Sequence, residues 1–385
     1  MENGLPKAEV IDTYRYPSRF DNSSHLKELT LECVRLGASD IYLQPGVPAC
    51  ARISGKLQAL GNRILSASEI ELLAKWATDR QSADTAYKGG TALNARYLIT
   101  DPTLTTEFET VRRSFRVNVS PITYDGNITA QIVMRSIPLE PFTLKQAGLD
   151  EDIARKMCPR NGLVLIAGET GSGKSTTFGS VVRFICENDT PIKGNIITVE
   201  EPIEFTYERI KSIHSIVAQS QIPENFKDFA AANAEAMRRK PNLLVYGEMR
   251  DKESITAGIE ASMTGHPVFA TVHASDVAAV IKRLISRYPE EQRATAIYDI
   301  IDNLRFIMAQ TLVPSVTGGL IPARSWLEFT LDIRESLSSM TNMAAVTSKV
   351  RTIVNTDGHS YSAEAHRLLE AGLIDKSGFN HLSHL

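Results

Sequence analysis

The chain of 385 residues has few cysteines and no long apolar segment. Because its four cysteines include no C-x-x-C pair, we expect reduced thiols in a cytoplasmic protein, and neither a zinc site nor a disulfide framework. No stretch approaches the ~20 apolar residues that a bilayer-spanning helix needs, so direct membrane insertion is not expected. The opening MENGLPKAEVID lacks a basic region followed by an apolar one, so we expect no signal peptide.

An excess of charge of one sign is also missing. The chain has 42 Lys and Arg residues against 45 Asp and Glu residues, for a net charge of −3. No basic field therefore indicates nucleic acid as a direct ligand. The sequence has no internal repeat and no low-complexity segment, and its length suits two domains that each have a core.

The patterns along the chain predict five segments. Two prolines in PLEPFT, which disfavour helix, indicate the linker between two domains. Before it, helical spacing and alternating strands predict a small α+β domain, including a turn at YDGN. The predicted segments are a flexible arm at 1–20, the α+β domain at 21–137, the linker at 138–144, an α/β domain at 145–330 and a helical tail at 331–385.

After the linker, strands alternate with helices. The apolar runs GLVLIAG, GNIITVEE, NLLVYGE and HPVFATVH are separated by helical patterns. That alternation predicts a parallel sheet with helices on both faces. Ligand sites in such sheets lie at the carboxyl ends of the strands, where each of the motifs below is found.

Residues 168–175 read GETGSGKS, between a buried strand and a helix, and match the phosphate-binding pattern G-x-x-x-x-G-K-[ST]. Backbone N–H groups of such a loop converge on phosphate oxygens, and the helix dipole favours negative charge. Lys174 would neutralise the β- and γ-phosphates, and the Ser175 hydroxyl would bind Mg²⁺. The alternative is a coincidental glycine-rich turn. The predicted ATP-binding residues are Gly168, Glu169, Thr170, Gly171, Ser172, Gly173, Lys174, Ser175 and Thr176.

Carboxylates follow two other predicted strands. Glu248 ends the strand of NLLVYGEMRD, where it could order Mg²⁺ or the attacking water; the alternative is a solvated side chain that closes a buried strand. In ITVEEPIEF, Glu200, Glu201 and Glu204 crowd a proline turn, which suggests a compensating cation. An acidic surface turn is the alternative here. The predicted Mg²⁺ ligands are Ser175, Glu200 and Glu201.

Histidines and arginines supply further candidates. His266 and His273 bracket the strand PVFATV, and only one of them can face the phosphate; we favour His273, although lone histidines are more often structural. In VRRSFRVN, alternation puts Arg112 and Arg116 on one face and Arg113 on the other. One of them could reach a neighbouring subunit's γ-phosphate, the alternative being a solvated basic face.

Together these segments resemble the secretion-ATPase superfamily of type II, type IV pilus and type IV secretion systems. The matching segments are GETGSGKST, EEPIEF, GEMRD, TGHPVFATVHAS and GASDIYLQPGVPACARISGKL, and the match runs from about Leu36 to Arg287. The resemblance implies a hexameric ring of subunits, each with a PAS-like domain followed by a RecA-like P-loop ATPase domain. It also implies that Glu204 and Glu248 act in hydrolysis, and that His273, and less firmly His266, couples nucleotide to conformation. The arginines of RRSFR would be inter-domain or inter-subunit arginine fingers.

Differences from the family's motifs indicate which branch of the family the sequence resembles most. The second acidic position of the EEPIEF segment is Glu201 in place of Asp, and the family's D-P-D before GEMRD is K-P-N here. No tetracysteine insert is present, unlike in pilus-assembly and type II ATPases, and the A-I-R-x-L-I-R-E segment of retraction motors is missing. The remaining resemblance is to DotB/TraJ-type ATPases of type IVB secretion and conjugation. It implies a cytoplasmic homohexamer recruited to an inner-membrane complex. A pilus-retraction motor and a nucleotide-controlled scaffold or DNA-binding coupling protein are the alternatives.

Overall fold

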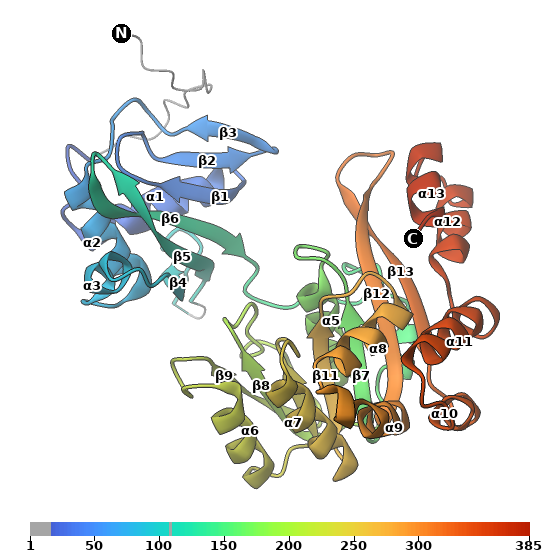
Figure 1. Cartoon of the computed structure of the whole chain (residues 1–385). Coiled ribbons are helices and arrows are strands. Elements are labelled where there is room, and N and C mark those ends of the chain that lie inside the picture. The colour runs from blue at the N-terminus through green and yellow to red at the C-terminus, as the bar shows by residue number, and fades with distance from the viewer. Residues whose placement is uncertain (1–16, 108–109) are drawn as a thin grey trace. The chain divides into compact units, whose positions relative to one another are not determined.

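The computed structural model describes residues 17–107 and 110–385 and divides the chain into two compact units (Figure 1). The first unit is Met1–Leu139 and the second is Glu140–Leu385. Their boundary falls inside the segment 138–144 that the two prolines marked as a linker. None of the helices in the described part of the chain is both long and apolar enough to cross a bilayer.

The first unit is a six-stranded antiparallel sheet in the order β3-β2-β1-β6-β5-β4, with three helices on one face (Figure 1). Along β5, Phe115, Val117 and Val119 are buried under these helices while Arg116 between them is exposed, as the alternating pattern predicts. The elements are α1 (Ser23–Arg35), β1 (Ala38–Leu43), β2 (Cys50–Ile53), β3 (Lys56–Ala59), α2 (Ala67–Thr78), α3 (Ala83–Lys88), β4 (Leu93–Thr100), β5 (Arg112–Tyr124) and β6 (Asn127–Ile137).

The turn between β5 and β6 has the conformation that YDGN indicates. Asp125 and Gly126 both have positive φ, 48° and 74°, and Tyr124 pairs with Asn127 across the turn. Two positive φ angles are the mark of a two-residue hairpin turn whose twist matches that of the strands. The hairpin register that sets the exposed face of β5 is therefore determined locally.

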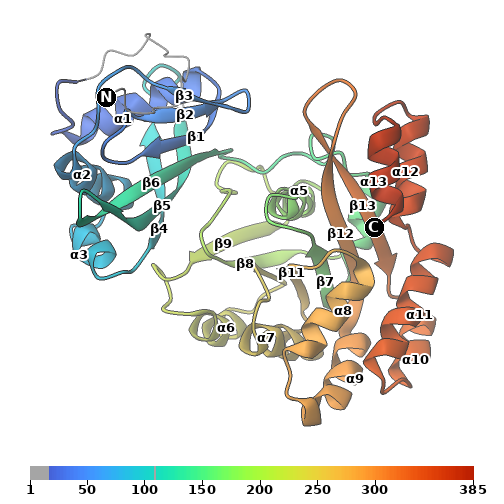
Figure 2. The same ribbon diagram turned by 45° about the horizontal axis from the view of Figure 1, so that its top comes forward.

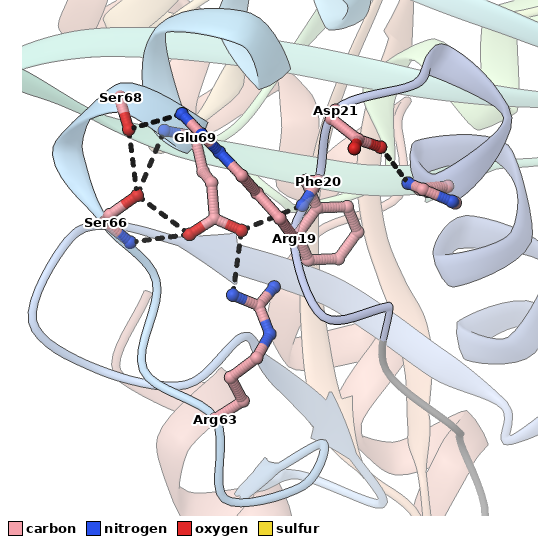
Figure 3. Close-up of polar contacts among 8 residues, drawn as sticks. Arg19, Phe20, Asp21, Arg63, Ser66, Ser68 and Glu69 are labelled. Carbon is pink, nitrogen blue, oxygen red and sulfur yellow. Dashed lines mark hydrogen bonds and ion pairs between the residues drawn. The ribbon is translucent and has the colours of Figure 1, made fainter.

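The chain enters the first unit through a buried polar cluster at the start of α2 (Figure 3). The Phe20 ring is fully buried, and its backbone N–H donates to Glu69 Oε1 at 2.9 Å. Glu69 also accepts from Arg63 Nη1 at 2.8 Å and forms a capping box with Ser66. Burial alone would raise the pKa of Glu69, but these donors outweigh it and lower the pKa.

The prediction of a flexible arm at 1–20 is therefore wrong at its end. Phe20 belongs to the core of the first unit, because its ring packs among the buried residues and Arg63 lies 5.1 Å above it. Arg19 also contacts this unit, through a 3.2 Å hydrogen bond to Ser68 Oγ. Residues 1–16, the rest of the predicted arm, lie outside the described residues.

Replacing Glu69 by Ala should destabilise the chain by about 3 kcal/mol, because it removes the N3 half of the capping box and the buried acceptor of the Phe20 N–H and of the partly buried Arg63. Urea denaturation of the full-length protein measures the loss. Glu71→Ala is the matched control on the same helix; its partly exposed ion pair with Lys88 should contribute less than ~1 kcal/mol. Equal losses for the two variants would contradict a special role of Glu69.

The second unit is a seven-stranded sheet in the order β13-β12-β7-β11-β10-β8-β9 (Figure 2). All neighbours pair in parallel except β12 and β13, which form an antiparallel hairpin. The sheet is thus mixed, where the sequence pattern indicated a parallel one. Its strands are β7 (Gly162–Ala167), β8 (Gly194–Glu200), β9 (Ser215–Gln221), β10 (Leu243–Tyr246), β11 (Pro267–Val272), β12 (Leu304–Pro314) and β13 (Leu320–Glu328).

Helices cover both faces of this sheet. Alternate residues of β7 enter two different cores: Leu163 and Leu165 pack with α6–α9, whereas Val164 and Ile166 pack with α4 and α5. Every residue of β7 is consequently buried, as expected for a central parallel strand. The helices are α4 (Glu151–Lys156), α5 (Lys174–Glu187), α6 (Phe229–Arg238), α7 (Lys252–Met263), α8 (Val277–Ser286) and α9 (Arg293–Asn303), with a short 3₁₀ helix at Glu290–Gln292.

The predicted tail is helical and is an integral part of the second unit. It comprises α10 (Leu331–Ser338), α11 (Met343–Thr356), α12 (Tyr361–Glu370) and α13 (Lys376–Ser383). Val346, Leu368 and Leu382 are buried in the same core as β12 and β13. Trp326 of β13 and His359 exchange two backbone hydrogen bonds, of 2.8 and 2.9 Å, which extend the sheet edge into the tail.

A buried carboxylate holds the start of α12. Glu364 is 3% exposed and accepts from His359 Nε2 at 2.9 Å and from Arg367 Nε and Nη2 at 2.8 and 2.9 Å. Burial by itself would raise the pKa of Glu364, but the donors from Arg367 and His359 outweigh it and lower the pKa to about 2. This carboxylate therefore stabilises the fold in its charged form.

The stabilisation from Glu364 should be complete above the unfolded pKa, about 4.5, and be lost as the pH falls from there towards about 2. Thermal melts of the wild type and of Glu364→Gln, from neutral pH down to about pH 3, should show a gap in Tm that narrows below about pH 4.5. The exposed Glu370→Gln on the same helix is the control and should follow the wild type. A gap that is independent of pH would contradict the assignment.

Candidate nucleotide-binding site

The GETGSGKS segment connects β7 to α5 and has the strand–loop–helix form that the motif requires. Gly171 and Gly173 both have φ of 83°, a left-handed conformation that favours glycine. At Gly168 a Cβ atom would lie 2.3 Å from the Gln310 carbonyl oxygen, so no larger residue fits there. The glycines therefore serve backbone geometry and close packing, as a loop that cradles phosphate needs.

The polar groups of the loop fit a phosphate. The Ser172 hydroxyl is buried and has no hydrogen-bond partner within the described residues. Lys174 is 9% exposed, and its ammonium group donates to the carbonyls of Gly168 and Glu169 at 2.9 and 2.8 Å. Burial lowers the pKa of Lys174, while Glu248 and Glu204 oppose that shift. A buried cation over a turn of backbone amides is complementary to a polyphosphate.

Glu248 and His273 come together at the carboxyl ends of neighbouring strands. Glu248 follows β10, His273 follows β11, and His273 Nε2 lies 3.6 Å from Glu248 Oε1. Both side chains are about one-third exposed, so water can reach them. Because Glu248 and Glu204 are the charges that act on Lys174, the structure gathers four predicted residues at this edge of the sheet.

The other two acidic candidates have protein partners. Glu200 Oε1 accepts from Thr198 Oγ1 at 2.6 Å and from Gln219 Nε2 at 3.2 Å, and burial raises its pKa. Glu201 Oε2 lies 3.6 Å from Arg250 Nη2. Across residues 17–107 and 110–385, no group of three or more His, Cys, Asp or Glu side chains is arranged to hold a metal. Mg²⁺ binding by Ser175, Glu200 and Glu201 stays a prediction.

The structure separates the two histidines of the PVFATV strand. His266 precedes β11 at the edge where β7 begins, and its backbone oxygen accepts from Gly162 N at 3.1 Å. Its Nδ1 lies 3.2 Å from both Thr264 Oγ1 and the Ala261 oxygen. Six residues of strand, about 20 Å, lie between it and the phosphate loop. Of these two histidines, His273 is the one near the phosphate loop of its own chain. A role for His266 stays a prediction.

The predicted arginines differ in their surroundings. Arg113 Nε lies 3.1 Å from Asp101 Oδ2, so this side chain has a partner within its own unit. Arg112 and Arg116 are exposed on the face of the sheet that carries no helix. Arg116 stands directly between Arg96 of β4 and Arg135 of β6 in the strand register. Two members of this row have partners in their own unit: Arg135 Nε lies 2.7 Å from Asp40 Oδ1, and Arg96 Nε donates to Ser114 Oγ at 2.9 Å.

A model of the family described as type II/IV secretion system protein matches residues 24–319, which cover most of both units. The chain belongs to the type II/IV secretion ATPase family. Its members include the type IV pilus retraction ATPase PilT of Pseudomonas aeruginosa, which is 32% identical over 310 residues, 80% of this chain and 84% of PilT.

Solved structures of secretion ATPases match more than nine-tenths of the chain. The ATPase DotB of Yersinia pseudotuberculosis is 49% identical, with a TM-score of 0.85 over 99% of both chains. DotB of Legionella pneumophila is 33% identical, with a TM-score of 0.81 over 97% of this chain and 98% of the other. A structure of the pilus retraction motor PilT with bound ADP is 27% identical, with a TM-score of 0.76 over 92% of this chain and 96% of that one.

Three residues of this secretion ATPase that the structure places beside predicted site residues were not predicted from the sequence. Arg96 and Arg135 join Arg116 only through strand register, which a single run of sequence does not reveal. Gln310 contacts the phosphate loop from β12, and no motif of the sequence includes it. The one available signal for Gln310 was a polar residue inside the apolar run LRFIMAQTLV.

Replacing Lys174 by Ala should abolish measurable ATP binding and turnover, since it removes the cation that the loop and the two carboxylates surround. Isothermal titration calorimetry and phosphate release measure the two effects. Lys193→Ala removes an exposed lysine of the same unit and should bind ATP like the wild type. Unchanged affinity in Lys174→Ala would contradict the assignment of the site.

Proposed function

We propose that this ATPase powers a type IVB secretion or conjugative transfer complex at the inner membrane. The likeness to the two DotB structures carries the proposal, because it covers 99% and 97% of the chain. The match with the family model ends at residue 319, so the likeness to DotB includes the four tail helices that lie beyond it. The tail is where the sequence departs from pilus-retraction motors.

ATP would bind through the loop and first helical turn, residues 168–176, with Lys174 on the phosphates. When bound, Mg²⁺ held by Ser175 and the nearby carboxylates would neutralise phosphate charge. Glu248 would orient the attacking water, and His273, 3.6 Å away, would respond to the loss of the γ-phosphate. This assignment is supported by the position of both groups at the strand ends next to the loop.

The assembly would be a homohexamer of subunits with a PAS-like and a RecA-like domain. Arg112 or Arg116 would complete the nucleotide site of a neighbouring subunit, which makes hydrolysis depend on ring geometry. Support comes from the exposed position of both arginines on the face of the sheet that carries no helix. Successive hydrolysis events would then perform mechanical work on a membrane complex.

A pilus-retraction motor is the second candidate. It is favoured by PilT of Pseudomonas aeruginosa, whose 32% identity extends over 84% of its length. Against it stands the divergent tail, in which SLSSMTNMAAVTSKV replaces the retraction motif. The two candidates share the chemistry of ATP hydrolysis and differ in the membrane complex to which they dock.

Glu248→Gln should bind ATP with near wild-type affinity yet hydrolyse it at least about 100-fold more slowly, because the amide cannot act as a base towards water. Phosphate release under saturating ATP and equilibrium binding separate the two properties. Glu260→Gln, an exposed position on α7, should hydrolyse normally. Normal turnover by Glu248→Gln would remove Glu248 from the reaction.

The same variant tests the cellular role. Glu248→Gln, expressed with an affinity tag in its native cell, should accumulate in the ATP-bound state on its docking partner and be recovered with the membrane fraction. Lys174→Ala is the matched variant without nucleotide. Co-purification of a secretion or conjugation core with Glu248→Gln supports the proposal. Recovery of pilus inner-membrane components contradicts it and favours the retraction motor.

A further inference from the structure

Gln310 is a buried amide of β12 that contacts the phosphate loop, although 138 residues separate it from Ser172. β12 pairs in parallel with β7 (Figure 1). Ala309 lies opposite Ala167, so Gln310 is level with the start of the loop. Its side chain is 2% exposed. We propose that Gln310 is a positioning residue for ATP, which orients the Ser172–Gly173 peptide so that its N–H faces the phosphates.

The partners of Gln310 determine which way its amide points. Nε2 donates to the Ser172 carbonyl at 2.6 Å. Oε1 accepts from Thr177 Oγ1 and from Arg324 Nε, both at 2.8 Å. In the reverse orientation, the amide oxygen would face a carbonyl and the NH₂ group would face a guanidinium, so neither pair could hydrogen-bond. The amide is therefore held in one orientation.

A hydrogen bond to the Ser172 oxygen also orients the next N–H. The cis peptide bonds of the described residues precede only prolines, so the Ser172–Gly173 peptide is trans. In a trans peptide the C=O and N–H groups point in opposite directions. Since Gln310 holds the carbonyl towards β12, the Gly173 N–H points away from the sheet. Gly173 is the N-cap of α5, where free N–H groups bind anions.

The packing around Gln310 leaves the loop little room to shift. A Cβ atom on Gly173 would lie 2.9 Å from Gln310 Nε2, and one on Gly168 would lie 2.3 Å from the backbone oxygen of Gln310. The Gln310 backbone thus lies against the beginning of the glycine loop, and its side chain contacts the end of the loop and, through Thr177, the first turn of α5. A loop held at these three points is preorganised for the phosphates.

Arg324 supports Gln310 from the adjacent strand. Its side chain is 6% exposed, and besides Gln310 it donates to the backbone oxygens of Ala147, at 2.6 Å, and Gly148. Burial lowers the pKa of Arg324 to about 10, so it remains charged at neutral pH. A hydrogen bond from a charged donor is stronger than one between neutral groups, which holds the Gln310 oxygen in place.

The test is Gln310→Met, which keeps the length of the side chain and removes its hydrogen bonds. ADP and ATP should bind about tenfold more weakly by calorimetry, the loss expected for one buried hydrogen bond. The loop holds the phosphates in the ground state and in the transition state alike. The loss should therefore be found in Kd and KM and much less in kcat at saturating ATP.

The matched control is Asn303→Ala. Asn303 is a buried amide that immediately precedes β12 at the opposite end of the strand, with a 2.8 Å hydrogen bond to the Asp299 oxygen. Melting curves identify a temperature at which both variants are folded, and there Asn303→Ala should bind like the wild type. Wild-type affinity in Gln310→Met, or equal losses in both variants, would overturn the proposal.

A milder variant covers the case in which Gln310→Met does not fold. Thr177→Val keeps the shape of the side chain and removes one donor to Gln310 Oε1, and it should weaken ADP binding about threefold. Unchanged affinity in that variant would overturn the proposal.

The inference rests on the proposed nucleotide site, and the two can fail separately. If the wild type and Lys174→Ala bind ATP equally, the site itself is wrong. If Lys174→Ala loses affinity for ATP while Gln310→Met binds ATP normally, the nucleotide site is supported and the positioning role of Gln310 is contradicted.

Discussion

Parallel pairing of β7 with β11 and β12 is the constraint on which the candidate site depends. Because these strands run in the same direction, whatever follows each of them emerges at one edge of the sheet. The phosphate loop follows β7, and His273 follows β11. Glu248 follows β10, which pairs with β11. The shared direction of the strands therefore brings the candidate residues together, because each of them follows the carboxyl end of a strand.

The sequence predicted the parts of this arrangement that are local. GETGSGKS contains its own glycines, lysine and helix start, so both the loop and its place between β7 and α5 could be inferred. YDGN determined a hairpin turn in the same way. Glu248 and His273 were inferred because each directly follows an apolar run that could be recognised as a strand.

What the sequence did not predict depends on pairing between distant segments. The neighbours of Arg116 are set by the register of β4, β5 and β6, and nothing within RRSFR encodes them. Phe20 looked like part of a polar arm because its contacts are with distant residues, such as Glu69, which is 49 residues away. The packing of the tail escaped for the same reason, since its apolar residues indicate burial without indicating a partner. The antiparallel β12–β13 hairpin is local, and it was missed although its strands are adjacent in the chain.

The distance along the chain between Ser172 and Gln310 has a consequence for biosynthesis. A nascent chain that has just completed α5 contains the entire phosphate-binding motif, yet the side chain that orients the Ser172–Gly173 peptide has not been made. Arg324, which supports Gln310, is made later still. Contacts of such long range form late in folding, after the intervening loops have been closed. Nucleotide should therefore select chains whose sheet is complete, and by mass action it should stabilise them over partly folded ones.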